Sequence, residues 1–137
     1  MNENEVKVFT LKEANELLPV LSDLLRDLQR KRHNVSELEV QIDSLELISG
    51  SGDQAAEKEL EKLIEKHRQI VAKFYEVVDE IHSHGCLLKD VDLGLIDFYG
   101  AVEGHIVCLC WRLGEEQVRF WHEVTEGYAG REPLSEN

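Results

Sequence analysis

Apolar side chains recur at heptad spacing in two stretches of the chain. The first run consists of Leu21, Leu24, Leu28, Val35, Leu38, Ile42 and Leu45, and Lys31 takes the one polar position within it. The second consists of Ala56, Leu60, Leu63, His67, Ile70, Phe74, Val77 and Ile81. This spacing keeps the apolar side chains on one face of a helix and is typical of coiled coils.

The segment SGSGD, residues 49–53, separates the two runs and contains two glycines. It predicts a turn, with Asp53 as the N-cap of the second helix. The runs are almost symmetric about residues 50 and 51, so they predict an antiparallel hairpin. The facing pairs would be Leu21 with Ile81, Leu28 with Phe74, Lys31 with Ile70, Val35 with His67, Leu38 with Leu63, Ile42 with Leu60, and Leu45 with Ala56.

Capping residues predict where the helices begin and end. Thr10 and Glu13 have the spacing of a capping box, so the first helix should begin near Leu11. Pro19 lies about two turns further on and predicts either a kink or a separate short first helix. Gly85 is placed to end the second helix, because glycine readily adopts the left-handed conformation found there.

The last third of the chain has a different pattern. Residues 95–99, 105–113 and 117–124 are rich in β-branched and aromatic side chains, and GAVEG and GEE separate them. They predict an antiparallel meander of about three strands, with a short helix as the alternative for 117–124. KDVD and Gly94 should form a turn. The expected fold is therefore α+β, a single domain over 1–137 with a helical hairpin (10–84) and a β-rich region (85–134).

Side chains alternate between the two faces of a strand, so the three strands sort their residues into two sets. The set expected to pack on the helices is Ile96, Phe98, Ile106, Cys108, Cys110, Val118, Phe120 and His122. The set expected on the other face is Asp97, Tyr99, His105, Val107, Leu109, Trp111, Arg119, Trp121 and Glu123. The second set mixes aromatic and charged residues, which is typical of a recognition surface.

Charge and cysteine content narrow the function classes. The net charge of -13, from 28 acidic and 15 basic residues, repels phosphate backbones and anionic membranes, so neither nucleic acid nor membrane is an expected partner. The opening MNENEV is too polar for a secretory signal, and no apolar run approaches the ~20 residues of a membrane span. Three cysteines without framework spacing indicate free thiols and a cytoplasmic protein.

Three segments resemble the bacterial domain-of-unknown-function family 2203. They are FTLKEANELLP (9–19), KDVDLGLIDF (89–98) and LCWRLGEEQVRFWHEVTEGYAGREPL (109–134). The resemblance covers nearly the whole chain and implies no established activity. The matched positions that it singles out are Asp97, Trp111, Glu115, Trp121, His122 and Arg131.

We expect a non-catalytic binding or interaction module that forms a homodimer, because the second sheet face would need a partner to cover its tryptophans. Its candidate surface is Asp97, Trp111, Glu115, Arg119, Trp121, His122 and Arg131. No metal or other cofactor is expected. Cys108 and Cys110 lack a second ligand pair at zinc-site spacing, which favours packing in the core. The partner, a protein or a small molecule, is left open.

An enzyme is the alternative. Asp97, Glu115 and His122 are residue types that bind zinc, iron or manganese or that transfer protons, and Arg131 could hold an anionic group of a substrate. His122 could equally be a core imidazole whose hydrogen bonds are satisfied. A coiled-coil adaptor is a third class, which the hairpin alone would support.

Overall fold

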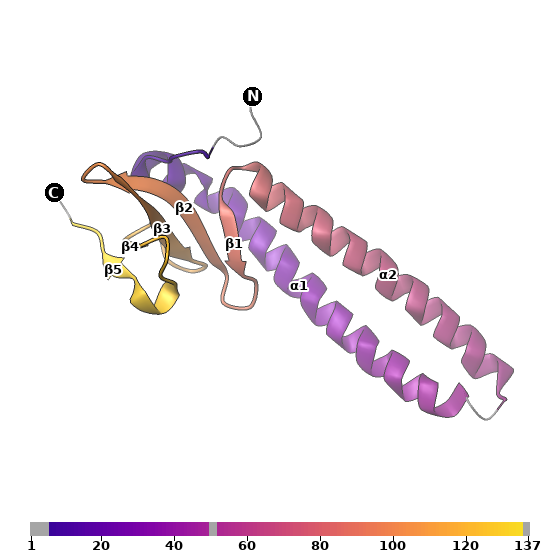
Figure 1. Cartoon of the computed structure of the whole chain (residues 1–137). Helices are drawn as coiled ribbons and strands as arrows, with labels where there is room; N and C mark the ends of the chain where they lie inside the picture. The colour runs from indigo at the N-terminus through magenta and orange to yellow at the C-terminus, as the bar shows by residue number, and fades with distance from the viewer. Residues whose placement is uncertain (1–5, 50–51, 136–137) are drawn as a thin grey trace. The chain divides into compact units, whose positions relative to one another are not determined.

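The structure is a computed structural model that describes residues 6–49 and 52–135. Its elements in order are α1 (Leu11–Ser49), α2 (Gln54–Ser83), β1 (Leu87–Asp90), β2 (Leu95–Val102), β3 (His105–Arg112), β4 (Phe120–His122), the 3-10 helix η1 (Tyr128–Gly130) and β5 (Glu132–Pro133) (Figure 1). The fold is α+β, as expected. The chain divides into two compact units: a hairpin unit, Asp27–Val78, and a sheet unit, which comprises the segments up to Arg26 and from Asp79 onward.

The capping predictions are confirmed. At the start of α1, Thr10 N–H donates to Glu13 Oε1 at 2.9 Å and Glu13 N–H donates to Thr10 Oγ1 at 3.1 Å. At the start of α2, Asp53 Oδ1 accepts from Ala55 N–H at 3.0 Å. Gly85, with φ of +92°, follows the end of α2, and its N–H donates to the His82 carbonyl at 2.9 Å. Gly50 and Ser51, within the predicted turn, lie outside the described residues.

Helix α1 continues through Pro19, so the separate first helix does not form. A proline inside a helix removes one backbone hydrogen bond at a cost of about 3 kcal/mol. Burial on either side of it favours the continuous helix, because Leu18 and Leu21 are both buried.

None of the helices in the described part of the chain is both long and apolar enough to cross a membrane.

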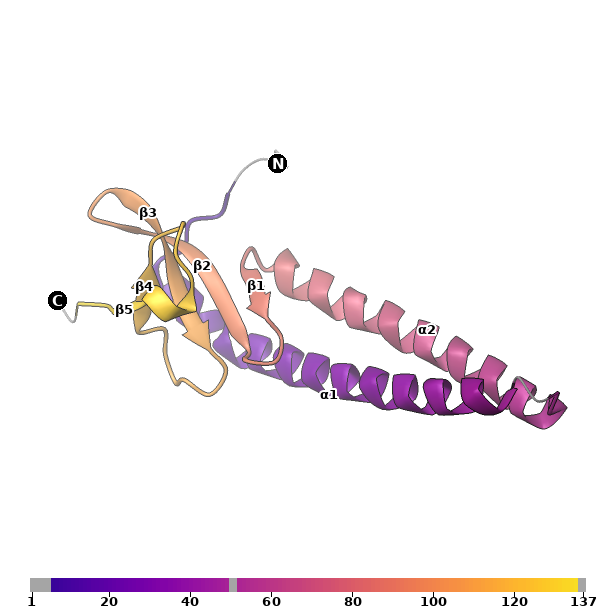
Figure 2. The same cartoon turned by 60° about the horizontal axis from the view of Figure 1, so that its bottom comes forward.

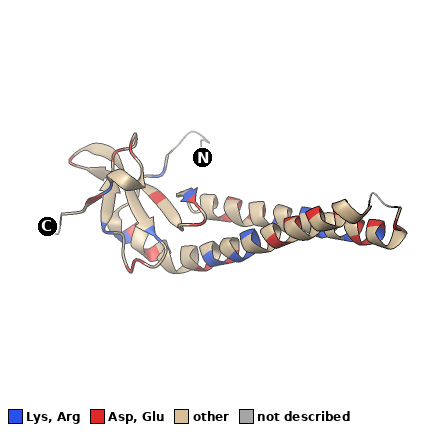
Figure 3. Cartoon of the chain, turned by 90° about the horizontal axis from the view of Figure 1, so that it is seen from below, with Lys and Arg blue, Asp and Glu red and all other residues tan. Residues whose placement is uncertain are grey.

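In the hairpin unit the predicted apolar face is confirmed. Every position of the two heptad runs within this unit is buried or half-buried. The outward positions carry both signs of charge along α1 and α2 (Figure 3). The heptad spacing of apolar residues was therefore sufficient to predict which face of each helix is buried.

One side-chain contact between the two helices lies about one turn from the predicted pairing. His67 Nε2 lies 3.2 Å from Glu39 Oε1, one turn beyond Val35, and Phe74 lines a hollow together with Arg32 and Val35. Side chains on an α-helix lean toward the N-terminus of their own helix. In an antiparallel pair of helices, side chains therefore meet residues that are shifted along the helix from the backbone position directly opposite. The prediction, which paired residues symmetrically about residues 50 and 51, did not include this shift.

The sheet has five strands in the order β1-β2-β3-β4-β5, all antiparallel, rather than about three. Strand β1 was missed because Lys89 and Asp90 were assigned to a turn. That turn follows at residues 91–94 and ends in Gly94, whose φ is +69°. Within 117–124 only Phe120–His122 form a strand, which pairs on its far side with β5.

The predicted sorting of the sheet faces is wrong for β2. Asp97 pairs with Cys110 and Ile96 pairs with Trp111, so β2 contributes to each face the residues that we had placed on the other. We call the two faces the thiol face and the tryptophan face. The thiol face contains Asp97, Tyr99, Cys108, Cys110, Phe120 and His122. The tryptophan face contains Ile96, Phe98, Val107, Leu109, Trp111 and Trp121.

The tryptophan face carries the core of the sheet unit. Phe98 contacts Phe9, which precedes α1, edge to face with ring centroids 5.1 Å apart. The first turns of α1 lie beside the sheet in both Figure 1 and Figure 2, and they contribute the buried residues Ala14, Leu18, Leu21 and Leu25. Asn15 Oδ1 also accepts from Val118 N–H at 2.7 Å. Trp111 is 1% exposed within one chain, so it is not the open surface that we had expected.

Candidate functional site

Four residues with metal-binding or catalytic side chains meet on the thiol face. Asp97 on β2 pairs with Cys110 on β3, and Cys108 on β3 pairs with His122 on β4. All four are buried. Cross-strand partners have Cβ atoms about 5 Å apart, so the register alone brings the carboxylate, the imidazole and the thiols together.

The centre of this group is the Asp97 and His122 pair. His122 Nε2 lies 3.0 Å from Asp97 Oδ2, and His122 Nδ1 lies 2.8 Å from the Glu123 carbonyl oxygen. A carbonyl only accepts, so Nδ1 carries a proton and the Nε2 lone pair of the neutral ring points at Asp97. Nε2 and the carboxylate therefore lie close enough to bind one cation together.

Cys110 completes a compact set of potential ligands. The ligand atoms of Asp97, Cys110 and His122 all lie within 4.8 Å of one another. Burial raises the pKa of Cys110 to about 11, and the charge of Asp97 adds to this effect while Arg131 opposes it. Burial, followed by the charge of Asp97, also raises the pKa of Cys108 to about 11. Without a bound cation, both thiols are protonated at neutral pH.

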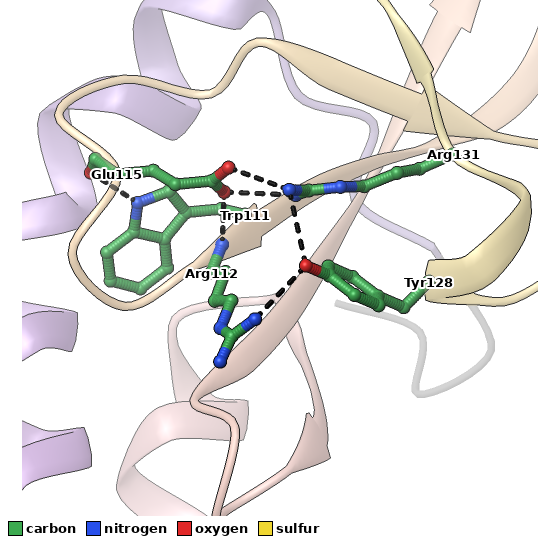
Figure 4. Close-up of polar contacts among 5 residues, drawn as sticks. All are labelled: Trp111, Arg112, Glu115, Tyr128 and Arg131. Carbon is green, nitrogen blue, oxygen red and sulfur yellow. Dashed lines mark hydrogen bonds and ion pairs between the residues drawn. The ribbon is translucent and has the colours of Figure 1, made fainter.

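A second polar network joins Trp111, Arg112, Glu115, Tyr128 and Arg131 (Figure 4). Arg131 donates to both oxygens of Glu115, at 3.0 and 2.9 Å, and Glu115 Oε1 also accepts from Arg112 N–H at 2.7 Å. The Trp111 indole N–H donates to the Glu115 carbonyl at 2.8 Å. Glu115 thus joins the end of β3 to the C-terminal segment.

The C-terminal segment is held against the thiol face by Arg131 and Tyr128. The Arg131 guanidinium lies 3.9 Å from the centroid of the Phe120 ring and 4.4 Å from that of Tyr128. Burial works against its charge, but the hydrogen bonds and attraction of Glu115 outweigh burial and raise the pKa of Arg131. Arg131 therefore stays charged and links the Glu115 carboxylate to the Phe120 ring of the thiol face.

The structure brings together only part of the predicted metal set. Asp97 and His122 are in contact, as the alternative required. Glu115 instead binds Arg131, and its place in the compact set is taken by Cys110. We had assigned Cys110 to the face opposite Asp97. Had the strand register been known, it would have identified the cysteine, because Asp97 and Cys110 are direct partners.

The remaining candidate residues are divided between interior and surface. Trp111 is buried and Trp121 is half-buried on the tryptophan face. Arg119 is exposed, and its carbonyl accepts from Leu134 N–H at 2.8 Å. These seven candidates therefore do not form one continuous open surface.

The fold and this site define a class of α+β proteins in which a long helical hairpin is joined to a five-stranded antiparallel sheet with a buried polar cluster. The profile of an uncharacterised conserved protein family, DUF2203, matches residues 7–134, and the chain belongs to this family. Searches of curated proteins and of solved structures found no match.

Proposed function

We propose that this protein is a non-catalytic interaction module that forms a homodimer through its hairpin unit. The observation that carries the proposal is an incompletely covered apolar seam between α1 and α2. Of the apolar residues described in this unit, only Leu28, Leu38 and Ala56 are buried. The other seam positions are half-buried, because each helix of a two-helix hairpin covers its neighbour from one side only.

We expect a second hairpin to bind at a hollow along this seam. It has a volume of about 320 Å³ and is lined by Arg32, Val35, Ser36, Glu39, Val71, Phe74 and Tyr75. The Tyr75 side chain is 59% exposed. Its lining combines apolar and polar side chains, as protein interfaces do.

The edge of α2 beside the hollow carries three apolar residues, with Arg68 between the first two. Ile64, Val71 and Tyr75 follow one another at spacings of seven and four residues, so they lie on the same side of the helix. Ile64 is 47% exposed. A second hairpin that laid this edge into the hollow, and received the same edge in return, would form a symmetric four-helix arrangement. Both seams would then be covered.

The arrangement of the candidate catalytic residues favours a module without catalytic activity. Both ring nitrogens of His122 already have partners within the chain, and His122 and Asp97 are 3% and 2% exposed. A general base must come within hydrogen-bonding distance of a substrate proton. In the alternative, an enzyme using Asp97, Glu115 and His122, the C-terminal segment would have to move away from the thiol face first.

The proposal is tested by light scattering coupled to size exclusion. We expect the wild-type chain to elute as a dimer. Tyr75→Glu should weaken dimerisation at least tenfold, since it places a charge in the covered seam. Tyr75 is exposed in the single chain, so far-UV circular dichroism should show an unchanged helix content.

The matched control is Leu47→Glu, which introduces the same charge at an exposed apolar position of α1 that does not line the hollow. This variant should remain a dimer. A monomeric wild-type protein, or a Tyr75→Glu variant that dimerises as tightly as the wild type, would contradict the proposal.

A further inference from the structure

The side chains that meet on the thiol face are those that bind a transition-metal ion. Asp97, Cys110 and His122 come from three adjacent strands, β2, β3 and β4, and offer one oxygen, one sulfur and one nitrogen within 4.8 Å of one another. Ligands supplied by neighbouring strands are held by the backbone hydrogen bonds of the sheet. The backbone positions of the three ligands are therefore set before any ion binds.

The orientation of His122 is that of a metal-binding histidine. Its Nδ1–H donates to the Glu123 carbonyl, which leaves the Nε2 lone pair directed at the cluster. Histidine ligands in metal sites usually have such a carbonyl or carboxylate partner, which fixes both the ring orientation and the tautomer. The 3.0 Å between Nε2 and Asp97 Oδ2 is a few tenths of an ångström below the ligand spacing of a tetrahedral zinc site, about 3.3 Å.

The charges in the cluster also suit a divalent ion. One carboxylate and one thiolate neutralise it, and the imidazole ligand is neutral. The neighbouring ion pair of Glu115 and Arg131 is itself balanced. A buried site without net charge avoids the several kcal/mol that an unpaired buried ion costs.

We propose that Asp97, Cys110 and His122 bind one zinc ion, which links β2, β3 and β4 beneath the C-terminal segment. A thiolate together with an imidazole favours zinc over magnesium, calcium or manganese, which prefer oxygen ligands. A water molecule takes the fourth position, which leaves the site without net charge. Because the three ligands are buried, a substrate does not reach the ion from solvent, so this site is compatible with a non-catalytic module.

The first experiment measures the metal content of the full-length protein purified without chelator, followed by replacement with cobalt(II). We expect about one equivalent of zinc per chain. We also expect the cobalt form to show the thiolate-to-metal charge-transfer band of a site with a cysteine ligand. Protein that contains no stoichiometric zinc and gives no such band with cobalt would overturn the proposal. The Asp97 and His122 pair would then be an ion pair joined by a proton.

Two cysteine variants in the same unit provide the matched comparison. Cys110→Ser should lose stoichiometric cobalt and its band. Cys86→Ser should keep both, because Cys86 is also buried but donates to the Ile81 carbonyl, away from the cluster. Retention of the band in Cys110→Ser would overturn the assignment of the ligand.

If Cys110→Ser does not fold, X-ray absorption of the zinc-loaded wild-type protein decides the question. One sulfur ligand together with nitrogen and oxygen ligands is expected. A zinc ion bound by nitrogen and oxygen alone would refute the site. Light scattering on the same samples keeps this result separate from the homodimer, which involves residues of the hairpin unit only.

Discussion

At the scale of single residues, burial decides how much an ion pair stabilises the fold. Two arginines of this chain illustrate this. Arg131 and Arg68 each form a two-pronged ion pair with a glutamate. The side chains of Arg131 and Glu115 are 15% and 23% exposed, whereas those of Arg68 and Glu65 are 74% and 49% exposed. Water screens an exposed pair and replaces its hydrogen bonds when it breaks, so the same geometry should stabilise the fold less at Arg68.

We therefore predict that Arg131→Gln lowers the free energy of unfolding by about 2 kcal/mol, because it leaves the half-buried Glu115 carboxylate without its charged partner. Arg68→Gln should lower it much less, because water screens this exposed pair. Urea unfolding followed by circular dichroism measures both. Equal losses in the two variants would contradict the role assigned to burial.

At the scale of elements, helices and strands differed in how well spacing predicted them. The apolar face of each helix follows from the spacing of its own residues. The structure confirms that the heptad positions lie on the buried side. The faces of β2 depend on its partner strand. Its connection to β3 is a two-residue turn, Glu103 and Gly104, both with positive φ, and this turn pairs each odd position of β2 with an even position of β3. Our sorting had grouped even positions with even ones, and a slip of one residue exchanges the two faces of a strand.

The helical assignment leads to a prediction with two leucines of α1. Leu38 lies on the seam and is 5% exposed, whereas Leu47 lies on the outer side and is 88% exposed. Leu38→Ala should destabilise the protein by about 2 to 4 kcal/mol, through lost burial and the cavity left behind. Leu47→Ala should change stability by less than about 0.5 kcal/mol. Thermal and urea unfolding provide the comparison, and a larger loss for Leu47→Ala would show that the seam has been assigned to the wrong face.

At the scale of the whole molecule, the two units differ in how much of their apolar surface is buried within a single chain. The described residues of the sheet unit contain most of the fully buried apolar side chains, among them Phe98, Val107 and Trp111. Those of the hairpin unit contain few, because a pair of helices has little interior. Regions with little buried apolar surface open more readily to solvent.

Hydrogen exchange should show this difference directly. We predict slow exchange of the β2 and β3 amides at all protein concentrations. Exchange within residues 30–75 should be faster in dilute protein and should slow as the concentration rises, because a second hairpin then covers the seam. Mass spectrometry of peptides from the exchanged protein resolves the two regions. Hairpin protection that does not depend on concentration would contradict self-association through this unit.

The sequence by itself determined the features of this protein that depend on local interactions. The helix caps at Thr10, Asp53 and Gly85, the inner faces of both helices and the α+β class depend on contacts between residues close in the chain, so spacing and residue type were sufficient. The family, too, was recognisable from its motifs. These features would be recovered without any knowledge of how the strands pair.

Only the tertiary structure decided the candidate site. Asp97, Cys110 and His122 are brought together by the registers of β2, β3 and β4, and those registers depend on the length of each turn and on which face of the sheet is buried. A difference of one residue in a turn leaves the local pattern of apolar positions unchanged but moves a carboxylate to the opposite face. The alternation within each strand was visible in the sequence, whereas the alignment of one strand with the next was not.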